Sequence, residues 1–262
     1  MGADSSTIER AVILSAGKGS RLLPLTADRP KCLLPLGGAS ILEWQLDALQ
    51  SAGITEVVVV TGFRPDLVDA VLAQARGSGL AVRSIFNPFY HVADNLGSVW
   101  LARSAFDRDC LLLNGDTLVP PALIERLLAA PPSPICVAVD EKSAYDDDDM
   151  KVLRDGDRLV RIGKGLGPDG CNAESIGLLR FIREGREAFL DGAERALRTP
   201  EGTSQFYLGV IDRLADTGIV TTASISGLEW AEVDYPADYE AAQALAARWS
   251  AAGRPLRAEP GA

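Results

Sequence analysis

AVILSAGKGSRLLPLTADRPKCLLPLGG, residues 11–38, begins as an apolar strand and continues into a loop rich in glycine and in cations before any helix starts. Gly17 and Gly19 let backbone N–H groups approach an anion without interference from a Cβ, and Lys18 and Arg21 add positive charge. This pattern predicts a cradle for a polyphosphate. The glycines alone are equally compatible with a structural turn, and the stretch matches neither the Walker pattern GxxxxGK(S/T) nor the dinucleotide pattern GxGxxG.

The composition suits one large α/β domain, which we expect to span residues 1–262 with flexible ends at 1–8 and 251–262. The formal net charge of -10 argues against a general nucleic-acid or anionic-membrane surface. Four well-separated cysteines and one histidine indicate neither a zinc site nor a disulfide framework. Since the chain lacks both an apolar run of roughly 18 residues and a signal peptide, we expect a cytoplasmic protein.

Short apolar runs alternate with stretches of helical period, which is typical of a doubly wound, mostly parallel sheet. After residue 140 the pattern changes to short alternating strands with Gly-Asp turns, which predicts a small β-hairpin layer appended to a mixed sheet. The expected fold class is therefore Rossmann-like α/β. Strands are predicted at 10–16, 56–62, 81–86 and 110–116, the hairpin at 150–165, and helices at 41–53, 183–198, 203–215 and 236–249.

The continuation of the opening loop favours a nucleotide site over a structural turn. Residues 15–26, SAGKGSRLLPLT, and residues 29–36, RPKCLLPL, resemble the signature of the sugar-phosphate nucleotidyltransferases and their cytidylyltransferase relatives. That signature reads AAGxG(S/T)R(L/M)xPLT followed by PKx(L/M)xP, and Ser15 replaces its first alanine. The similarity is dense to about residue 118 and thin afterwards, as far as the segment EVDYPADY at 232–239.

The resemblance implies transfer of a nucleoside monophosphate from a nucleoside triphosphate to a phosphorylated acceptor, with release of pyrophosphate. Arg21 and Lys31 would hold the triphosphate as catalytic residues. Because the acceptor's phosphate is already an anion near neutral pH, positioning and charge stabilisation suffice without a general base. Lys18 lies in the middle of the loop, and the alternative for its side chain is that it points into solvent. The loop residues expected to face the nucleotide are Ala16, Gly17, Lys18, Gly19 and Ser20.

Two aspartates are candidates for ligands of Mg²⁺, the implied cofactor. Asp116 follows the apolar run CLLLNG at the carboxyl end of a strand, where open α/β sheets bind ligands, and it is also a nucleotide-binding candidate. Asp234 would complete the metal site as its counterpart does in the relatives, since Mg²⁺ prefers carboxylates together with phosphate oxygens. The alternatives are a turn role for Asp116, Glu232 or Asp238 as the ligand, and helix capping by Asp238.

Asn95 and Ser98 lie in a segment that resembles the choline-phosphate and phosphonate cytidylyltransferases. The resemblance assigns them to nucleotide binding, although the same segment is also compatible with contacts to the acceptor. Helix capping by Asp94 or Asn95 is the structural alternative. Trp100 lies at helical spacing and is expected in the core, and His91 is expected in a loop or in the core.

The acceptor candidates follow an acidic run, Asp146–Asp149. The run is expected to be a solvated loop, with contact to a cationic acceptor group as the alternative. Lys151 resembles a lysine that meets the acceptor phosphate, which gives it a catalytic and an acceptor-binding role, and Lys164 is the second candidate. Glu174 is predicted to bind an acceptor hydroxyl or amine, with a simple ion pair to a lysine as the alternative.

These features favour Mg²⁺-dependent transfer of CMP from CTP to a small phosphate or phosphonate acceptor, similar to phosphocholine or aminoethylphosphonate. A sugar-1-phosphate nucleotidyltransferase using UTP, dTTP or GTP is the alternative within the class. A catalytically inactive regulatory subunit is the alternative outside it, against which the presence of Arg21, Lys31 and Asp116 argues. The expected partners are the nucleotide and the acceptor, without nucleic acid or membrane, and homo-oligomerisation is left open.

Overall fold

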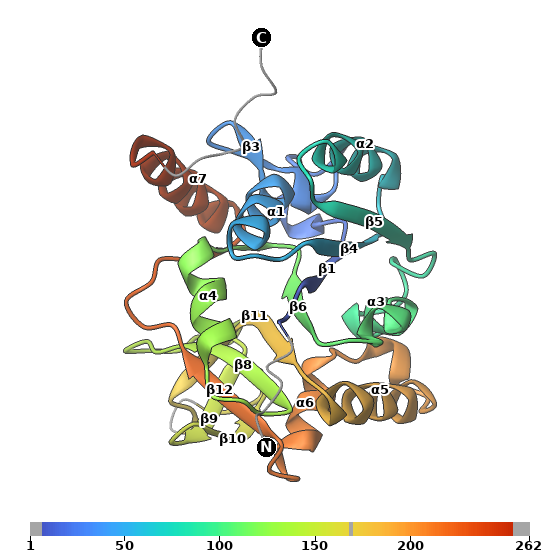
Figure 1. Cartoon of the computed structure of the whole chain (residues 1–262), viewed down its shortest axis with the longest axis vertical. Helices are drawn as coiled ribbons and strands as arrows, with labels where there is room; N and C mark the ends of the chain where they lie inside the picture. Colours follow the sequence, from blue (N-terminus) through green and yellow to red (C-terminus); the bar gives the residue numbers. More distant parts are fainter. Residues whose placement is uncertain (1–6, 168–169, 254–262) are drawn as a thin grey trace.

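A nine-stranded sheet in the order β5-β4-β1-β6-β11-β8-β12-β10-β9 forms the centre of the protein (Figure 1). The structure is a computed structural model that describes residues 7–167 and 170–253. The sheet strands are β1 Arg10–Ser15, β4 Glu56–Thr61, β5 Ala81–Phe86, β6 Cys110–Asn114, β8 Ile135–Asp140, β9 Lys151–Asp155, β10 Arg158–Ile162, β11 Ala173–Phe181 and β12 Val220–Ser224. Short strands pair outside it: β2 Pro35–Leu36 with β3 Ala39–Ser40, and β7 Thr117–Leu118 with β13 Ala231–Glu232.

Strands β5, β4, β1 and β6 are parallel, whereas β11 runs antiparallel to both β6 and β8. The parallel strands are nearly continuous apolar runs because helices cover both faces of the sheet. In β1, Ala11 and Ile13 face one hydrophobic cluster, while Val12 faces the other. The expected α/β fold with a mixed sheet is confirmed.

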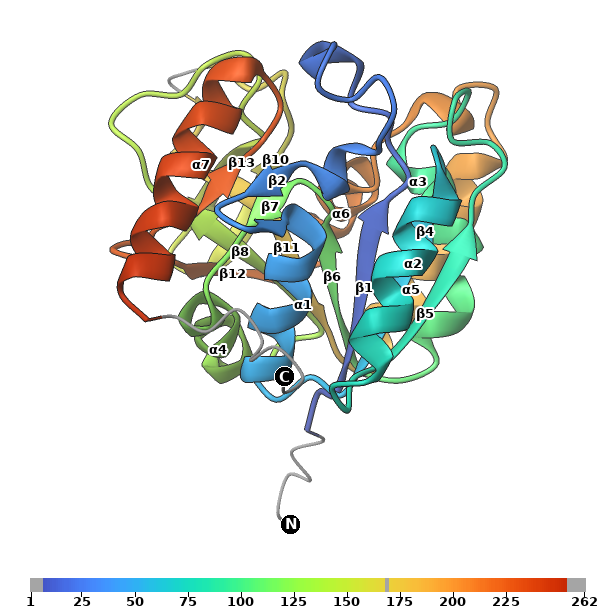
Figure 2. The same ribbon diagram turned by 90° about the horizontal axis from the view of Figure 1, so that it is seen from above.

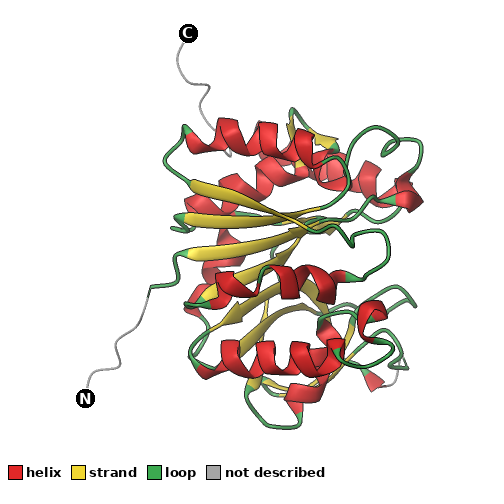
Figure 3. Ribbon diagram, turned by 90° about the vertical axis from the view of Figure 1, so that its right-hand side faces the viewer, coloured by secondary structure: helices red, strands yellow, loops and turns green. Residues whose placement is uncertain are grey.

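Helices lie on both faces of the sheet (Figure 3). One face packs against α1, α2 and α4, and the other against α3, α5 and α6. A third cluster joins α7 to the β2–β3 turn, and Figure 2 shows α7 beside β2 and β13. The helices are α1 Ile41–Ser51, α2 Pro65–Arg76, α3 Asn95–Leu101, α4 Pro121–Ala129, α5 Glu184–Leu197, α6 Leu208–Ala215 and α7 Pro236–Ala251, with 3-10 turns at Ser20–Leu22, Lys31–Leu33, Arg103–Phe106 and Gly202–Ser204.

The expected hairpin is present as β9 and β10, and it continues the main sheet. Strand β9 also pairs with the start of β11, so β11, β8, β12, β10 and β9 form a closed ring of pairings. The closure is possible because the register of β11 shifts between Ser175 and Leu179, which lets its first part pair with β9 and its second part with β6. The hairpin, residues 151–162, therefore lies beside the start of β11, whose second part pairs with β6.

Each of the two ends that were expected to be flexible, 1–8 and 251–262, contains a residue that belongs to the folded part. Ile8 packs against the core, and α7 continues to Ala251. Residues 1–6 and 254–262 lie outside the described part. Within that part, none of the helices has the length and apolar character that crossing a membrane requires.

Candidate active site

The opening loop lies at the carboxyl end of β1, between the strand and the first 3-10 turn. Gly19 has φ +72°, and a Cβ there would lie 2.9 Å from the Cβ of Lys31, so both conformation and space require glycine. The Thr26 hydroxyl donates to the Gly19 carbonyl at 2.7 Å. At Gly17, in contrast, a Cβ would meet no protein atom within 4 Å. The loop is thus packed on the Lys31 segment and open at Gly17.

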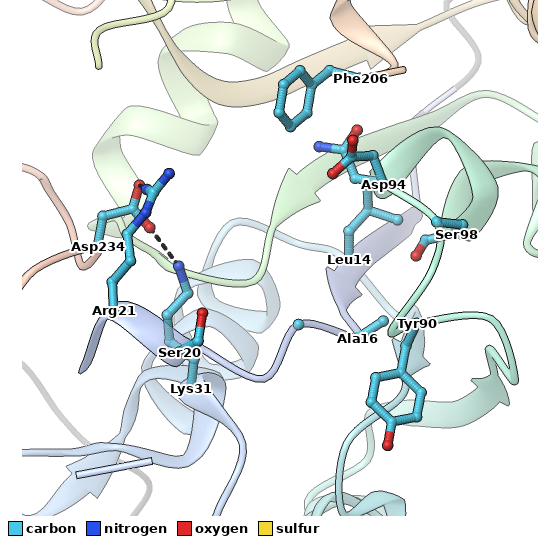
Figure 4. A pocket seen from close by; sticks show the side chains of 14 residues that line it. Leu14, Ala16, Ser20, Arg21, Lys31, Tyr90, Asp94, Ser98, Phe206 and Asp234 are labelled. Atoms are coloured by element: carbon cyan, nitrogen blue, oxygen red, sulfur yellow. Dashed lines mark hydrogen bonds and ion pairs between the residues drawn. The ribbon is translucent and has the colours of Figure 1, made fainter. Parts of the chain in front are cut away.

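A cavity of about 380 Å³ lies beside this loop. Figure 4 shows Arg21, Lys31 and Asp234 on one side of it and Tyr90, Asp94 and Ser98 on the other. The predicted site residues among its lining are Ala16, Gly17, Gly19, Ser20, Arg21, Lys31, Asn95, Ser98 and Asp234. Sequence reasoning weighed Asp94 only as a helix cap and missed four other lining residues, which belong to no motif: Leu14, Tyr90, Ala93 and Phe206.

Lys31 joins the two predicted metal ligands. Its Nζ donates to Asp116 Oδ2 and to Asp234 Oδ1, at 2.7 Å each. Burial lowers the pKa of Lys31, but the two carboxylates outweigh burial and hold it above its ordinary value. Arg21 lies 3.3 Å from the other oxygen of Asp234. Two cations and two carboxylates therefore meet beside the cavity, whose lining includes Arg21, Lys31 and Asp234 but not Asp116.

Asp116 is positioned by a side chain that the sequence did not single out. Gln45 of α1 is fully buried and donates through Nε2 to the carbonyls of Asn114 at 2.7 Å and Thr117 at 2.8 Å. These carbonyls flank the turn that carries Asp116. The backbone N–H of Val233 donates to the Asp116 carbonyl, and β13 pairs with β7, which brings Asp234 to the same place.

The donor set fits Mg²⁺. Asp116 and Asp234 already share one cation, the Lys31 ammonium, so their oxygens are close enough to serve a common cation. The described residues contain no group of three or more His, Cys, Asp or Glu side chains arranged for a metal. This suits Mg²⁺, which is usually held by one or two carboxylates together with phosphate oxygens and water.

The alternatives for Asp234 are less suited to this role. Asp238 accepts hydrogen bonds from the backbone N–H groups of Asp234 and Tyr235, at 3.1 and 2.8 Å, and thus has the capping role that was weighed for it. Glu232 lies on β13, where it pairs with Thr117, and burial together with the charges of Asp116 and Asp234 raises its pKa to about 8, which favours the protonated form over a metal ligand.

Asn95 and Ser98 line the cavity from α3 but also make internal hydrogen bonds. Asn95 Oδ1 accepts from the Tyr207 N–H at 2.9 Å, and Ser98 Oγ accepts from Asn87 at 3.0 Å. Asp94 stands at the N-cap position without a side-chain capping bond. Both nucleotide-binding candidates are therefore held in fixed orientations at the wall of the cavity.

One expectation for an individual residue needs revision: Trp100 is half-buried beside the Arg103 guanidinium instead of in the core. Lys18 is exposed and outside the lining of the cavity, which matches the solvent alternative, and its ammonium lies 5.3 Å from the centre of the Phe63 ring. His91 lies in a turn, one of the two places expected for it, and its ring meets that of Tyr90 edge-on.

The acceptor candidates form a second charged group, outside the lining of the cavity. Lys151 is buried and donates to the Lys164 carbonyl at 3.2 Å, and Lys164 Nζ lies 3.5 Å from Asp148. Glu174 is buried and pairs with Lys142 at 2.6 Å, a lysine that sequence reasoning missed. Burial raises the pKa of Glu174 to about 7 although Lys142 lowers it.

Tyr235 connects the two groups. Its hydroxyl donates to Asp148 Oδ2 at 2.7 Å, and the Arg21 guanidinium lies 5.2 Å from the centre of its ring. The loop that carries the acidic run is thus tied to the triphosphate side of the cavity. Residues 146–148 of the run are exposed, as expected for a solvated loop, while Asp149 is half-buried and accepts a hydrogen bond from Lys142.

Solved structures share this fold. The CTP:phosphocholine cytidylyltransferase from Streptococcus pneumoniae superposes with a TM-score of 0.74 at 18% identity, over 90% of this chain and 98% of that one. The inositol-1-phosphate CTP transferase from T. maritima gives a TM-score of 0.73 at 24% identity, over 90% and 96%. At these identities the likeness establishes the nucleotidyltransferase fold.

A similar sequence is the CMP-5'-(3-aminopropyl)phosphonate synthase of Streptomyces rubellomurinus, 36% identical over 87% of this chain and 37% of the synthase. The 2-aminoethylphosphonate cytidylyltransferase of Lancefieldella rimae is 28% identical over 59% of this chain and 61% of that enzyme. The present chain spans about two fifths of the length of the synthase. Residues 11–200 match the MobA-like NTP transferase domain, the stretch that contains the glycine loop, Lys31 and Asp116. This chain belongs to the MobA-like NTP transferase family.

Proposed function

We propose that this protein transfers CMP from CTP to a small phosphate or phosphonate acceptor and releases pyrophosphate, with Mg²⁺ as its cofactor. Membership of the family supports nucleotidyl transfer, and the choice of nucleotide, acceptor, metal and site residues is our proposal. We also propose that the chain forms a single domain. The protein is predicted to be cytoplasmic.

One observation carries the proposal: Lys31 Nζ lies 2.7 Å from both Asp116 and Asp234, next to Arg21 and beside the cavity. A binding protein for a neutral ligand has no use for two cations and two carboxylates at one point. Triphosphate transfer requires both, because cations neutralise the phosphate oxygens and carboxylates hold a metal.

The residues divide the cavity into two ends. Arg21 and Lys31 would bind the β- and γ-phosphates, and the open backbone at Gly17 lets the α-phosphate approach. The opposite end, with Tyr90 and Phe206, is apolar enough to receive the base. Mg²⁺ held by Asp116 and Asp234 would neutralise the charge that develops on the phosphate oxygens.

In the reaction, an oxygen of the acceptor attacks the α-phosphorus of the nucleotide. A new P–O bond forms, the bond to the bridging oxygen breaks, and pyrophosphate leaves with the electron pair. Lys151 is the proposed partner of the acceptor's phosphate or phosphonate, with Lys164 next to it. The chain supplies position and charge, and the acceptor arrives as the anion that attacks.

The preference for CTP and a phosphonate rests on the relatives. Two of them carry the names of a CMP-aminopropylphosphonate synthase and an aminoethylphosphonate cytidylyltransferase. The regulatory alternative is disfavoured because Arg21, Lys31 and Asp116 are present and in contact with one another or with Asp234.

The proposal is tested by pyrophosphate release from CTP, UTP, dTTP, GTP and ATP with Mg²⁺, each against 2-aminoethylphosphonate, phosphocholine and glucose 1-phosphate. We expect release only with CTP and one of the two small acceptors. The variant Lys31→Met should lose at least roughly 100-fold in turnover, because it removes the cation nearest the leaving phosphates.

A matched control is Arg248→Met on α7, which removes an exposed ion pair with Glu229. This variant should retain normal turnover. Release with glucose 1-phosphate alone would move the protein to the sugar-nucleotide branch. Near-normal turnover of Lys31→Met would contradict the assignment of the site.

A further inference from the structure

Lys142, Asp149 and Glu174 form a compact ion cluster that the mechanism above does not use. The Lys142 ammonium lies 2.6 Å from Glu174 Oε2 and 3.1 Å from Asp149 Oδ1. The Glu174 side chain is 3% exposed and that of Asp149 12%, whereas Lys142 is 38% exposed. The two carboxylates are thus fixed and buried, and the cation between them reaches in from the surface.

One carboxylate oxygen of Glu174 is available to a further hydrogen-bond donor. Its Oε1 is buried and makes no hydrogen bond within the described part of the chain, although a carboxylate at this depth ordinarily finds several donors. Lys142 uses only Oε2. Burial raises the pKa of Glu174 to about 7, Lys142 lowers it, and Asp149 raises it again. An ammonium group that takes the place of Lys142 without being tethered to the chain can approach both oxygens of Glu174.

Resting on the function proposed above, we propose that Glu174 and Asp149 bind a primary ammonium group of the acceptor. Lys142 is then a tethered substitute that occupies the same place when no acceptor is bound. The acceptor class that follows is a short phosphonate or phosphate with a primary amine at its far end.

The distance between the two ends of the acceptor comes from strand pairing. Glu174 of β11 lies directly opposite Lys151 of β9, so both side chains lie on the same face, with Cβ atoms roughly 5 Å apart. Lys151 is the proposed partner of the phosphonate. An acceptor whose phosphonate binds Lys151 and whose ammonium binds Glu174 must therefore be short, with a spacer of about two or three carbons between the two groups.

The cluster selects a primary ammonium over a quaternary one. Contacts of 2.6 and 3.1 Å from Nζ are hydrogen bonds that need N–H groups. A trimethylammonium group has none, and its methyl groups keep the nitrogen farther away. Recognition of quaternary groups relies on aromatic faces. The carboxylate pair offers the geometry that an –NH₃⁺ group uses.

The cluster is also connected to the nucleotide side. Asp149 follows Asp148, which accepts the hydrogen bond of Tyr235 under the Arg21 guanidinium. The loop with Asp149 is thereby held beside the triphosphate residues. An acceptor seated between Lys151 and the carboxylate pair lies next to the proposed site of transfer.

The test is calorimetric titration, without nucleotide, of 2-aminoethylphosphonate, ethylphosphonate and the trimethylammonium analogue of the first. The wild-type protein should bind the primary amine at least about tenfold more tightly than either of the others. Equal affinity for the three ligands would overturn the inference.

Two variants separate recognition from mere structural pairing. Lys142→Met should tighten binding of 2-aminoethylphosphonate by about tenfold, because the competing ammonium is gone, and leave ethylphosphonate unchanged. Asp149→Asn should weaken binding of the amine alone by about tenfold, since an amide oxygen still accepts the Asp146 N–H that now binds Asp149. Arg161→Met, which removes the exposed ion pair with Asp212, is the control and should behave as wild type.

A purely structural ion pair would give the opposite pattern: Lys142→Met would weaken or leave unchanged the binding of both ligands alike. If Lys142→Met fails to fold, Asp149→Asn decides. Binding is measured without nucleotide, so the two proposals can fail separately. Selectivity for the amine without pyrophosphate release would refute the proposed function and support this inference. Turnover without selectivity for the amine would refute this inference and support the proposed function.

Discussion

Replacing Glu174 by glutamine should change how the stability of the protein depends on pH. Burial raises the pKa of Glu174 from the ordinary value of 4.5 to about 7, with Lys142 opposing and Asp149 adding to the shift. The folded state therefore holds a proton that the unfolded chain has lost between these two values. The stability from this group is fully present below pH 4.5 and is lost as the pH rises through about 7.

The magnitude follows from the same two values. A difference between about 7 and 4.5 corresponds to roughly 3 kcal/mol of unfolding free energy. Part of this difference already develops below pH 5, so between pH 5 and pH 8 we expect about 2 kcal/mol. Glutamine keeps the shape of the side chain but has no proton to bind, so Glu174→Gln should lack this contribution at every pH.

The assay is urea unfolding of the wild-type protein and of Glu174→Gln at pH 5 and pH 8. Between these values the wild type should lose about 2 kcal/mol more unfolding free energy than the variant. All other groups titrate in both proteins, so their effects cancel in the comparison. Glu240→Gln, an exposed position on α7, is the control and should follow the wild type. Identical pH dependence in wild type and Glu174→Gln would refute the argument from burial.

Three further changes test the metal site, the floor of the cavity and the framework. Asp234→Asn should raise the Mg²⁺ concentration for half-maximal pyrophosphate release by at least about tenfold, and an unchanged value would exclude Asp234 as a ligand. Gly62→Ala should raise KM for CTP and destabilise the fold by about 1 to 3 kcal/mol, because its Cβ would lie 2.4 Å from the Ala16 carbonyl oxygen; normal kinetics would contradict this contact. Ser40→Ala should cost about 1 kcal/mol in thermal or urea unfolding with KM for CTP unchanged, because it removes the capping box of α1, and a change in KM would show that the cap also shapes the site.

Local patterns of the sequence were sufficient for the parallel half of the sheet. The predicted strands 56–62, 81–86 and 110–116 match β4, β5 and β6 to within two residues, because each is a short apolar run between polar or glycine-containing turns. The predicted helix 41–53 matches α1, which starts at its Ser40 cap and ends before Gly53. The nucleotide loop was recognisable because its glycines and cations are contiguous.

The candidate site was accessible from the sequence only in pieces. Asp116 and Asp234 were each proposed as metal ligands from their local context, and Lys31 as a triphosphate ligand. Their joint contact spans 203 residues between Lys31 and Asp234, and it depends on the pairing of β13 with β7. No local pattern specifies such a pairing, because the two strands come from distant parts of the sequence.

Lys142 and Gln45 are two residues whose roles could not be predicted from the sequence. Neither belongs to a motif, and both side chains are of types that are usually exposed. Gln45 gains its role from backbone carbonyls at the end of β6 and the start of β7, and Lys142 from carboxylates on β11 and in its own loop. Their roles follow from contacts between distant segments.

By itself, the sequence determined the α/β fold class, the phosphate loop and the chemical identity of the cations and carboxylates, because these are properties of contiguous residues. The tertiary structure alone decided which of them meet. The register shift in β11 closes the ring of strands and sets Glu174 opposite Lys151, and the β7–β13 pairing sets Asp234 against Lys31. Those contacts arise from the packing of the whole chain, which fixes strand register through buried side chains far away in the sequence.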